Sequence, residues 1–428
     1  MEAITHDQLK ETIYFEKLPN GLQVFVLPKE GFQKTYAAFS TRFGSIDNHF
    51  KVQGQEEQQV PDGIAHFLEH KMFEEPDGDV FAKFASNGAS ANAFTSFDRT
   101  VYLFSATESI SENLETLINF VQNPYFTDDN VEKEKGIIGQ EINMYKDNPD
   151  WRVYFGLIET MYRTHPVHID IAGTVESIAQ ITKETLYDCY HTFYHPSNMS
   201  LFVVGGINAE EMMTLIRDNQ ASKSFEPQGP IDRIFAEEPN EVAQARKETI
   251  LPVSLPKCLF GFKEAAPAVD GDELLRKELT MRLALDILFS PSAPLYQQLY
   301  DDNLISDGFG SEYNCSKDYA FSVIGGDTRS PEELMDRIRT ELEPIVRNGV
   351  DEASFERSRR KKIGAFLRMM NSPEAIANEF TKFRFRNTDL FKVLPMYEAI
   401  TLQEVNDSIK KHFDWNQFAA SLVTSKVK

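Results

Sequence analysis

The feature that most constrains this chain is the pentapeptide His66-Phe67-Leu68-Glu69-His70. In a helix, residues three and four apart share a face, so the two imidazoles and the carboxylate would point the same way. Two histidines one turn apart can bind a zinc ion, and a carboxylate beside them can accept a proton from a water on the metal. The order is the inverse of the commoner zinc-protease motif, because Glu69 directly precedes the second histidine. The motif therefore predicts a zinc-dependent peptidase.

The competing interpretation is that these polar residues form an ordinary solvated helix face. At helical pitch, an apolar stripe forms from Ile64, Phe67, Leu68 and Met72. The polar motif residues His66, Glu69 and His70 fall on the opposite side. The Pro-Asp-Gly sequence at 61–63 is a helix-start signal. We therefore predict an amphipathic helix that carries the motif on its polar side. The pattern leaves open whether that side faces water or a metal.

A third metal ligand is expected elsewhere, because a catalytic zinc commonly takes three protein ligands and leaves one position for water. Periodicity predicts a helix from about Asp128 to Lys146 with Glu134 and Glu141 on one stripe. These two glutamates lie two turns apart, about 10 Å along the axis, so both cannot touch the same ion. One would bind the metal and the other would support the site. Spacing alone does not decide which.

These two segments, with Asn92-Ala93-Phe94-Thr95-Ser96 between them, resemble the pitrilysin/insulinase family of inverzincin metallopeptidases, which includes the mitochondrial processing peptidases. The likeness covers essentially the whole chain. Within the family, the chain looks most like the short bacterial YmfH-like peptidases. The resemblance implies that His66, His70 and Glu141 bind one zinc ion per chain and that Glu69 is the general base.

Two supporting roles also follow from the resemblance. Glu134 would match a glutamate that orients the site without binding metal. The stretch 88–104 reads as two short strands that meet near residues 97–98. In the family, the equivalent of Asn92, Ala93 and Phe94 is an edge strand along which the peptide substrate lies, and an unpaired edge can accept an added strand. On the residues alone, an ordinary hairpin within a sheet is the simpler interpretation.

The chain is expected to contain two tandem homologous halves. A capped helix, a turn and a buried strand at 181–206 recur at 400–423, an offset of 219 residues. Strands and helices mix without regular βαβ alternation, which favours an α+β fold with a mostly antiparallel sheet and packed helices in each half. This agrees with the processing-peptidase-like fold that the resemblance implies. We predict a catalytic zinc-binding domain at 1–221, a linker at 222–245 and a degenerate non-catalytic repeat at 246–428.

The second half has lost the metal motif. The offset of 219 makes residues 286–289 (Asp-Ile-Leu-Phe) the equivalent of the motif in the second half. The only histidine of that half is His412. By the resemblance this half would close a chamber around the substrate, and in self-sufficient members it carries an Arg/Tyr pair. Tyr300 stands where the arginine is expected, and neither member of the pair is in place. We therefore expect a dimer, either of identical chains or with a zinc-less paralogue that supplies the pair.

Charge and composition exclude several classes of protein. The net charge of −22 argues against nucleic-acid binding, because phosphates would be repelled, and it favours cationic peptides as substrates. The N-terminus lacks the features of a signal peptide, and no apolar run is long enough to cross a membrane. Three widely spaced cysteines do not suggest a disulfide framework. These features predict a cytoplasmic protein that binds neither nucleic acid nor membrane.

The main hypothesis is a zinc endopeptidase that hydrolyses short or unfolded peptides inside a closed chamber. One alternative is a non-catalytic or partner-dependent zinc-binding subunit of a peptidase-like heterodimer. Another is a chaperone-like subunit that holds a peptide along residues 92–95 without cutting it. The intact Glu69 favours an enzyme, because a purely structural zinc site needs no base. The missing Arg/Tyr pair favours the alternatives.

Overall fold

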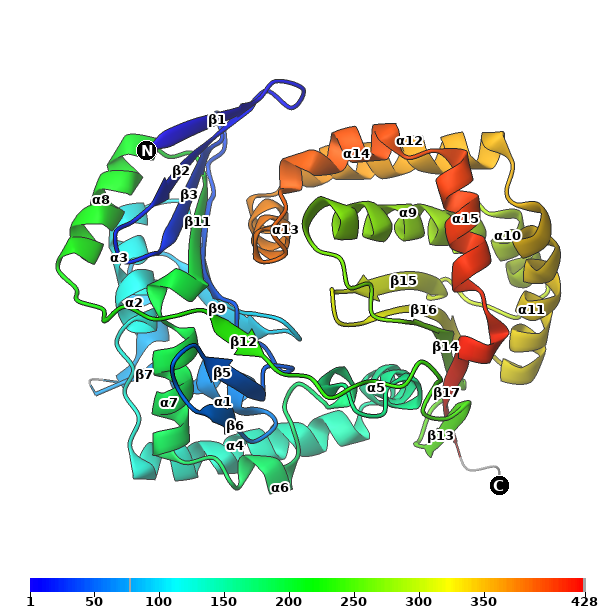
Figure 1. Cartoon of the computed structure of the whole chain (residues 1–428), viewed down its shortest axis with the longest axis horizontal. Helices are drawn as coiled ribbons and strands as arrows, with labels where there is room; N and C mark the ends of the chain where they lie inside the picture. Colours follow the sequence, from blue (N-terminus) through cyan, green and yellow to red (C-terminus); the bar gives the residue numbers. More distant parts are fainter. Residues whose placement is uncertain (77, 426–428) are drawn as a thin grey trace. The chain divides into compact units, whose positions relative to one another are not determined.

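The structure, a computed structural model, describes residues 1–76 and 78–425 (Figure 1). Internal contacts divide the chain into two compact units. Unit 1 comprises Met1–Ile142, Ile169–Phe235 and Met369–Phe385, and unit 2 comprises Asn143–His168, Ala236–Arg368 and Arg386–Lys428. Residues 143–168 of the first half of the sequence therefore pack in unit 2, and residues 369–385 of the second half pack in unit 1. The domain boundaries at residues 221 and 246 were predicted from the sequence repeat, and they stay a prediction.

Unit 1 is built on a mostly antiparallel sheet of seven described strands, in the order β1-β2-β3-β11-β4-β10-β9. The β3–β11 pair is parallel and the other pairs are antiparallel. The strands are β1 (Glu2–His6), β2 (Glu11–Lys17), β3 (Gln23–Pro28), β4 (Thr35–Thr41), β9 (Ser90–Thr95), β10 (Thr100–Ala106) and β11 (Met199–Gly205). The hairpin expected at 88–104 is thus confirmed, and β9 lies at the edge of the sheet.

Helices cover both faces of this sheet, which explains why β4 and β11 are buried along their whole length. Figure 1 shows α3 and α8 on one face and α13 on the other. On α13, Phe380 packs against Phe202 and Phe25, with ring centroids 4.4 and 4.9 Å apart. The helices of unit 1 are α1 (Ile64–Lys71), α2 (Val80–Ser86), α3 (Ile110–Val121), α6 (Val175–Ile178), α7 (Lys183–Phe193), α8 (Ala209–Ala221), α13 (Pro373–Phe385) and most of α4 (Asp128–Asp147).

Unit 2 contains a sheet of five described strands in the order β13-β17-β14-β16-β15. They are β13 (Arg246–Ile250), β14 (Lys257–Glu264), β15 (Gly310–Cys315), β16 (Ala320–Asp327) and β17 (Phe418–Thr424). Helix α5 packs on β17 and β14 so closely that a Cβ at Gly156 would lie 2.5 Å from Ser421 Oγ. The helices are α5 (Pro149–Met161), α9 (Gly271–Phe289), α10 (Pro294–Asp301), α11 (Pro331–Asn348), α12 (Glu352–Met369), α14 (Val393–Ala399) and α15 (Leu402–His412).

The two sheets confirm the expected duplication and the α+β class. The order β3-β11-β4-β10-β9 in unit 1 matches β13-β17-β14-β16-β15 in unit 2, and β3–β11 and β13–β17 are the parallel pairs. Helices α7 and α15 begin at residues 183 and 402, and strands β11 and β17 at 199 and 418, so both offsets are 219. Thr182 and Thr401 each form a capping box, which explains why the helix start could be read from the sequence.

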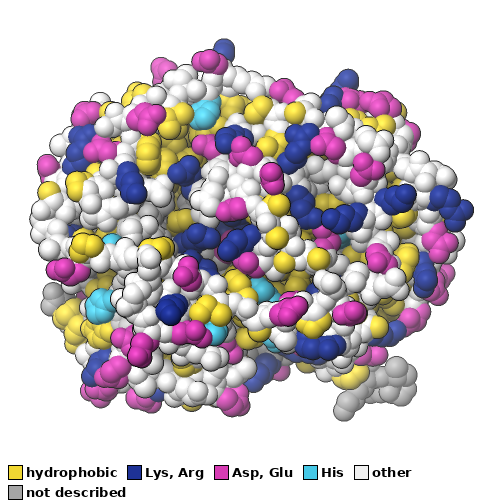
Figure 2. Space-filling view, in the orientation of Figure 1, with side chains coloured by type: hydrophobic (Ala, Val, Ile, Leu, Met, Phe, Trp, Pro, Cys, Tyr) yellow, Lys and Arg dark blue, Asp and Glu magenta, His cyan; other side chains and the backbone are white. Residues whose placement is uncertain are grey.

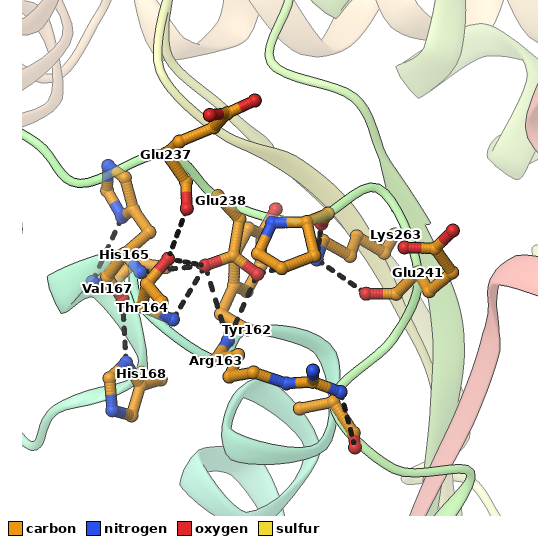
Figure 3. A network of polar contacts seen from close by, with 12 residues as sticks. Tyr162, Arg163, Thr164, His165, Val167, His168, Glu237, Glu238, Glu241 and Lys263 are labelled. Atoms are coloured by element: carbon orange, nitrogen blue, oxygen red, sulfur yellow. Dashed lines mark hydrogen bonds and ion pairs between the residues drawn. The ribbon is translucent and has the colours of Figure 1, made fainter.

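The segment expected to be a linker contains more regular contacts than its composition suggested. Within 222–245, β12 (Ile231–Arg233) pairs with β5 (His49–Val52), which also pairs with β6 (Glu57–Gln59), all in unit 1. Residues 236–245 of this segment belong to unit 2, where Glu238 is the centre of a polar network (Figure 3). Its carboxylate accepts hydrogen bonds from the backbone N–H groups of Arg163, Thr164 and His165 at 3.0, 2.7 and 2.8 Å. It also accepts one from Lys263 Nζ at 2.7 Å.

Replacing Glu238 by Gln should destabilise unit 2. Burial raises the pKa of Glu238, but the bonds from Lys263 and the backbone N–H groups outweigh burial and lower it to about 2. A depressed pKa stabilises the fold above the ordinary value near 4.5, and this contribution is lost as the pH falls toward 2. We expect a loss of about 1–3 kcal/mol at neutral pH and a weaker acid dependence, measured by urea titration. Glu237→Gln, an exposed neighbour with the same charge change, should leave the free energy of unfolding unchanged.

Three further features concern membrane-spanning helices, the cysteines and the distribution of surface charge. No helix within the described ranges is both long and apolar enough to cross a membrane. All three cysteines are buried, and none of them forms a disulfide. On the face shown in Figure 2, Lys and Arg side chains lie among the Asp and Glu side chains, so the net negative charge forms no single acidic area in that view.

Candidate active site

Helix α1 carries the motif and begins where the sequence predicted. Gly63 is its N-cap with a φ of 87°, a conformation that L side chains rarely adopt. A Cβ at this position would also lie 2.4 Å from the carbonyl oxygen of Ala172. The apolar stripe of Ile64, Phe67 and Leu68 is buried in unit 1. The start of the helix and its rotation about its own axis are therefore both determined by packing.

The polar side of α1 does not face bulk water. His66 and Glu69 are only 8% and 9% exposed, and His70 is half-buried. Because these side chains are buried, they do not form a solvated helix face. Buried polar groups cost free energy unless they have partners, so partners are expected within the site. The polar side of α1 is therefore largely buried.

Three side chains of this site converge on one point. Nε2 of His66 lies 3.7 Å from one carboxylate oxygen of Glu141, and Nε2 of His70 lies 3.5 Å from the other. These separations are too long for good hydrogen bonds. Ligand atoms of a tetrahedral zinc with bonds of about 2.0–2.2 Å lie about 3.3–3.6 Å apart. The His70 separation falls within this range, and the His66 separation is slightly longer. Among the described residues, this is the one group of three whose ligand atoms all lie within 4.8 Å.

Glu134 contacts the other side of the His70 ring. Its Oε1 lies 3.1 Å from His70 Nδ1, and its Oε2 lies 3.7 Å from Nζ of the fully buried Lys71. A carboxylate on Nδ1 fixes the ring and directs Nε2 toward a metal. Both glutamates come from α4, which spans Asp128–Asp147 as the periodicity predicted. The two residues thus take different positions, Glu141 at the convergence point and Glu134 behind the ring.

The surroundings shift the pKa values of three residues at this site, and the shift of His66 is the one that suits metal binding. Burial, with the neighbouring His70, lowers the pKa of His66 to about 3, so this ring is neutral and can donate a lone pair. Burial lowers the pKa of His70, but the bond to Glu134 and the nearby carboxylates outweigh it and raise the value. Burial raises the pKa of Glu69, partly offset by a hydrogen bond from Thr95. A raised carboxyl pKa is common in a general base.

A cavity of about 520 Å³ joins the motif to the edge strand. Glu69 and His70 line one part of it, and Asn92 and Ala93 of β9 line another. Two stacked rings, Phe73 and Phe81, with centroids 4.3 Å apart, supply an apolar wall. The remaining lining residues are Glu74, Gly78, Asp79, Lys133 and Glu134. The expected base and the expected substrate strand therefore face the same space.

Sequence reasoning missed two contacts at this site. Thr95 Oγ1 donates to Glu69 Oε2 at 2.6 Å, and the buried Lys71 pairs with Glu74 and Glu134. Lys71 follows the motif directly, so a charged residue on the inner side of an amphipathic helix was a signal that could have been noticed. The contact of Thr95 depends on how β9 crosses α1, and no local pattern reports that.

Comparisons with known proteins agree with this geometry. Residues 54–175 match the family model described as insulinase (peptidase family M16), and residues 180–362 match the peptidase M16 inactive domain. The uncharacterized zinc protease YmfH of Bacillus subtilis is 51% identical over 429 residues and is covered completely, as is this chain. The chain belongs to peptidase family M16. Two earlier expectations, the family and its fold, are thereby confirmed.

Solved structures of M16 proteins have the same fold. An M16-like peptidase from Alicyclobacillus acidocaldarius has a TM-score of 0.95 and 42% identity, with 97% of this chain and 99% of that chain covered. A protease from Helicobacter pylori has a TM-score of 0.81 at 20% identity, with 96% and 99% covered, and shows the fold alone. Several relatives are named zinc proteases, so zinc is the metal that this M16 chain should be tested with.

In the second half of this M16 chain, the described residues form no comparable group of metal ligands. The offset of 219 from the motif leads to Leu285, Leu288 and Phe289 on α9, and all three are buried apolar residues. Beside them, Asp286 is paired with Lys361 at 3.0 Å and Lys362 at 3.2 Å, both on α12. A carboxylate on the repeated helix is thus neutralised by lysine side chains. The match to an inactive-domain model is consistent with this replacement.

Proposed function

We propose that this chain is a zinc endopeptidase that hydrolyses short or unfolded peptides, with His66, His70 and Glu141 as the ligands of one zinc ion and Glu69 as the general base. The observation that carries the proposal is the convergence of both Nε2 atoms on the Glu141 carboxylate beside a cavity lined by Glu69. The edge strand β9 opens onto the same cavity.

Each residue has a defined task in this proposal. When bound, zinc would polarise the scissile carbonyl and make a coordinated water more acidic. The two imidazoles and Glu141 hold the ion, and Glu134 keeps the His70 ring in position through Nδ1. Glu69 accepts a proton from the attacking water and returns it to the leaving amine. Glu69 is suited to this task because burial raises its pKa while its carboxylate still faces the cavity.

The edge strand supports a peptide as the substrate. A peptide added to β9 would hydrogen-bond to main-chain groups regardless of its sequence, while its side chains would enter the cavity. Asn92 is exposed, Ala93 and Phe94 are half-buried, and Asn92 Oδ1 accepts a hydrogen bond from the Ala93 N–H at 2.9 Å. We expect cationic peptides to be preferred, because the chain carries a net charge of −22. We place the activity in the cytoplasm, in keeping with three cysteines that form no disulfide.

A partner-dependent form of the same activity is favoured by one observation. Tyr300 occupies the position where an arginine of the Arg/Tyr pair was expected, and its side chain on α10 is 44% exposed. We therefore propose a dimer as the working form, either a homodimer or a heterodimer with a zinc-less paralogue. Enclosure of the substrate in a chamber belongs to the same proposal.

Mass spectrometry of a peptide library tests the proposed function. The purified zinc-loaded chain is incubated with matched short peptides of cationic, neutral and acidic character. Cuts that appear with zinc and disappear after chelation, with cationic peptides cleaved fastest, are the expected result. A folded chain that binds zinc but cuts nothing would overturn stand-alone activity, and the same assay repeated with a zinc-less paralogue then tests the heterodimer. Silence under both conditions would favour a peptide-binding scaffold.

A further inference from the structure

The hydroxyl of Thr95 makes a short contact with the proposed general base. Thr95 is the last residue of β9, and its Oγ1 lies 2.6 Å from Glu69 Oε2 on α1. We propose that Thr95 is a positioning residue for Glu69: its hydroxyl holds one carboxylate oxygen so that the other is presented to the water and the leaving amine. Nothing in the family match or in the names of the relatives assigns a role to this residue.

The direction of the hydrogen bond follows from the neighbours. Thr100 lies opposite Thr95 on β10, and its hydroxyl donates to the backbone carbonyl of Phe43 at 2.9 Å. The hydrogen of Thr100 is therefore committed, so this hydroxyl cannot donate to Thr95, whose Oγ1 is 3.4 Å away. The hydrogen of Thr95 can go to a carboxylate at 2.6 Å or to a distant hydroxyl. The charge-assisted bond to Glu69 is shorter and stronger, so Thr95 is the donor and Glu69 the acceptor.

The consequence for Glu69 is a restricted side chain. A glutamate has several rotamers and a carboxylate that turns freely about its last bond. Within the described part of the chain, Thr95 is the side chain that donates a hydrogen bond to this carboxylate. Catalysis is sensitive to such positioning, because a misplacement of about 1 Å can cost about 100-fold in rate. The backbone of Thr95 also hydrogen-bonds to Glu69, so removing the hydroxyl should loosen the base without removing it.

The same strand would then serve two purposes. Asn92 and Ala93 line the cavity in which a peptide would add to β9, and Thr95 at the end of that strand holds Glu69. The register of β9 is set by its pairing with β10, where Thr95 lies opposite Thr100. The strand along which the substrate would lie therefore also fixes the position of Glu69.

Thr95→Val and Thr95→Ser separate this role from simple packing. Valine keeps the shape and removes the donor, whereas serine keeps the donor and removes a methyl group. Because the role rests on the proposed peptidase activity, the wild-type chain is assayed alongside with the same cationic peptide. We expect Thr95→Val to lower kcat by about 10- to 100-fold, with KM within twofold and zinc content unchanged, and Thr95→Ser to stay within threefold of wild type.

Two results would overturn the assignment. Thr95→Val could keep full kcat, or Thr95→Ser could be as impaired as Thr95→Val, which would point to packing by the methyl group. A wild-type chain without activity would count against the proposed function instead. In that case crystal structures of the zinc-loaded variants decide the role of Thr95. We expect the Glu69 carboxylate to leave its position in Thr95→Val and to keep it in Thr95→Ser, and an unmoved Glu69 in Thr95→Val would contradict the proposal.

Discussion

Glu69→Gln should abolish peptide cleavage while the chain still binds zinc with unchanged affinity. Glutamine has the shape of glutamate and can still accept the hydrogen bond from Thr95, but it cannot take a proton from water at neutral pH. Loss of a general base costs about 100- to 10,000-fold in rate. Glu69 is outside the group of His66, His70 and Glu141 whose atoms converge, so the metal should remain.

The measurement for this variant combines steady-state cleavage with the zinc content per chain. Glu132→Gln is a matched control, because it makes the same charge change on an exposed position of α4. It should cleave at the wild-type rate. Full turnover by Glu69→Gln would remove Glu69 from the mechanism. Loss of zinc together with activity would instead show that Glu69 supports the metal site and is not a separate base.

The two glutamates of α4 should differ sharply in their effect on zinc affinity. Glu134→Gln weakens the support of the His70 ring, and loss of such an outer partner typically costs about 10- to 100-fold in metal affinity. Glu141→Gln replaces the carboxylate onto which both Nε2 atoms converge, so we expect a larger loss than for Glu134→Gln. The two variants are matched in shape, charge change and helix.

Competition with a chromophoric chelator measures both affinities under the same conditions. A far-ultraviolet spectrum of each variant controls for folding, since α4 is a long helix of unit 1. The order of affinities should be wild type, then Glu134→Gln, then Glu141→Gln. A reversed order would mean that Glu134 binds the metal and Glu141 supports it. Equal losses would contradict the separation of roles between the two positions.

The candidate metal site was predictable from sequence only where helical periodicity relates its residues. His66, Glu69 and His70 lie within one turn of α1, so their common face needed no knowledge of the fold. The same rule placed Glu134 and Glu141 on one stripe of α4 but could not choose between them. That choice depends on where α4 passes α1, which is a tertiary fact. The resemblance to the M16 family supplied the choice, and the geometry agrees with it.

The fold was predictable where local signals repeat. Thr182 and Thr401 start equivalent helices with the same capping box, and the buried strands that follow have the same spacing, so the duplication could be read directly. The placement of α5 in unit 2 and α13 in unit 1 could not be read, because an apolar helix face does not itself show which sheet it packs on. The contact between Thr95 and Glu69 could not be read either, because it depends on how β9 crosses α1.

The location of bound zinc tests the account most directly. A crystal of the zinc-loaded Glu69→Gln variant, measured at wavelengths on either side of the zinc absorption edge, gives an anomalous map that shows where the metal lies. We predict one strong peak per chain, between Nε2 of His66, Nε2 of His70 and the Glu141 carboxylate, with Glu134 on the far side of the His70 ring. A peak elsewhere, or a fully loaded chain with no peak at these three residues, would contradict the account.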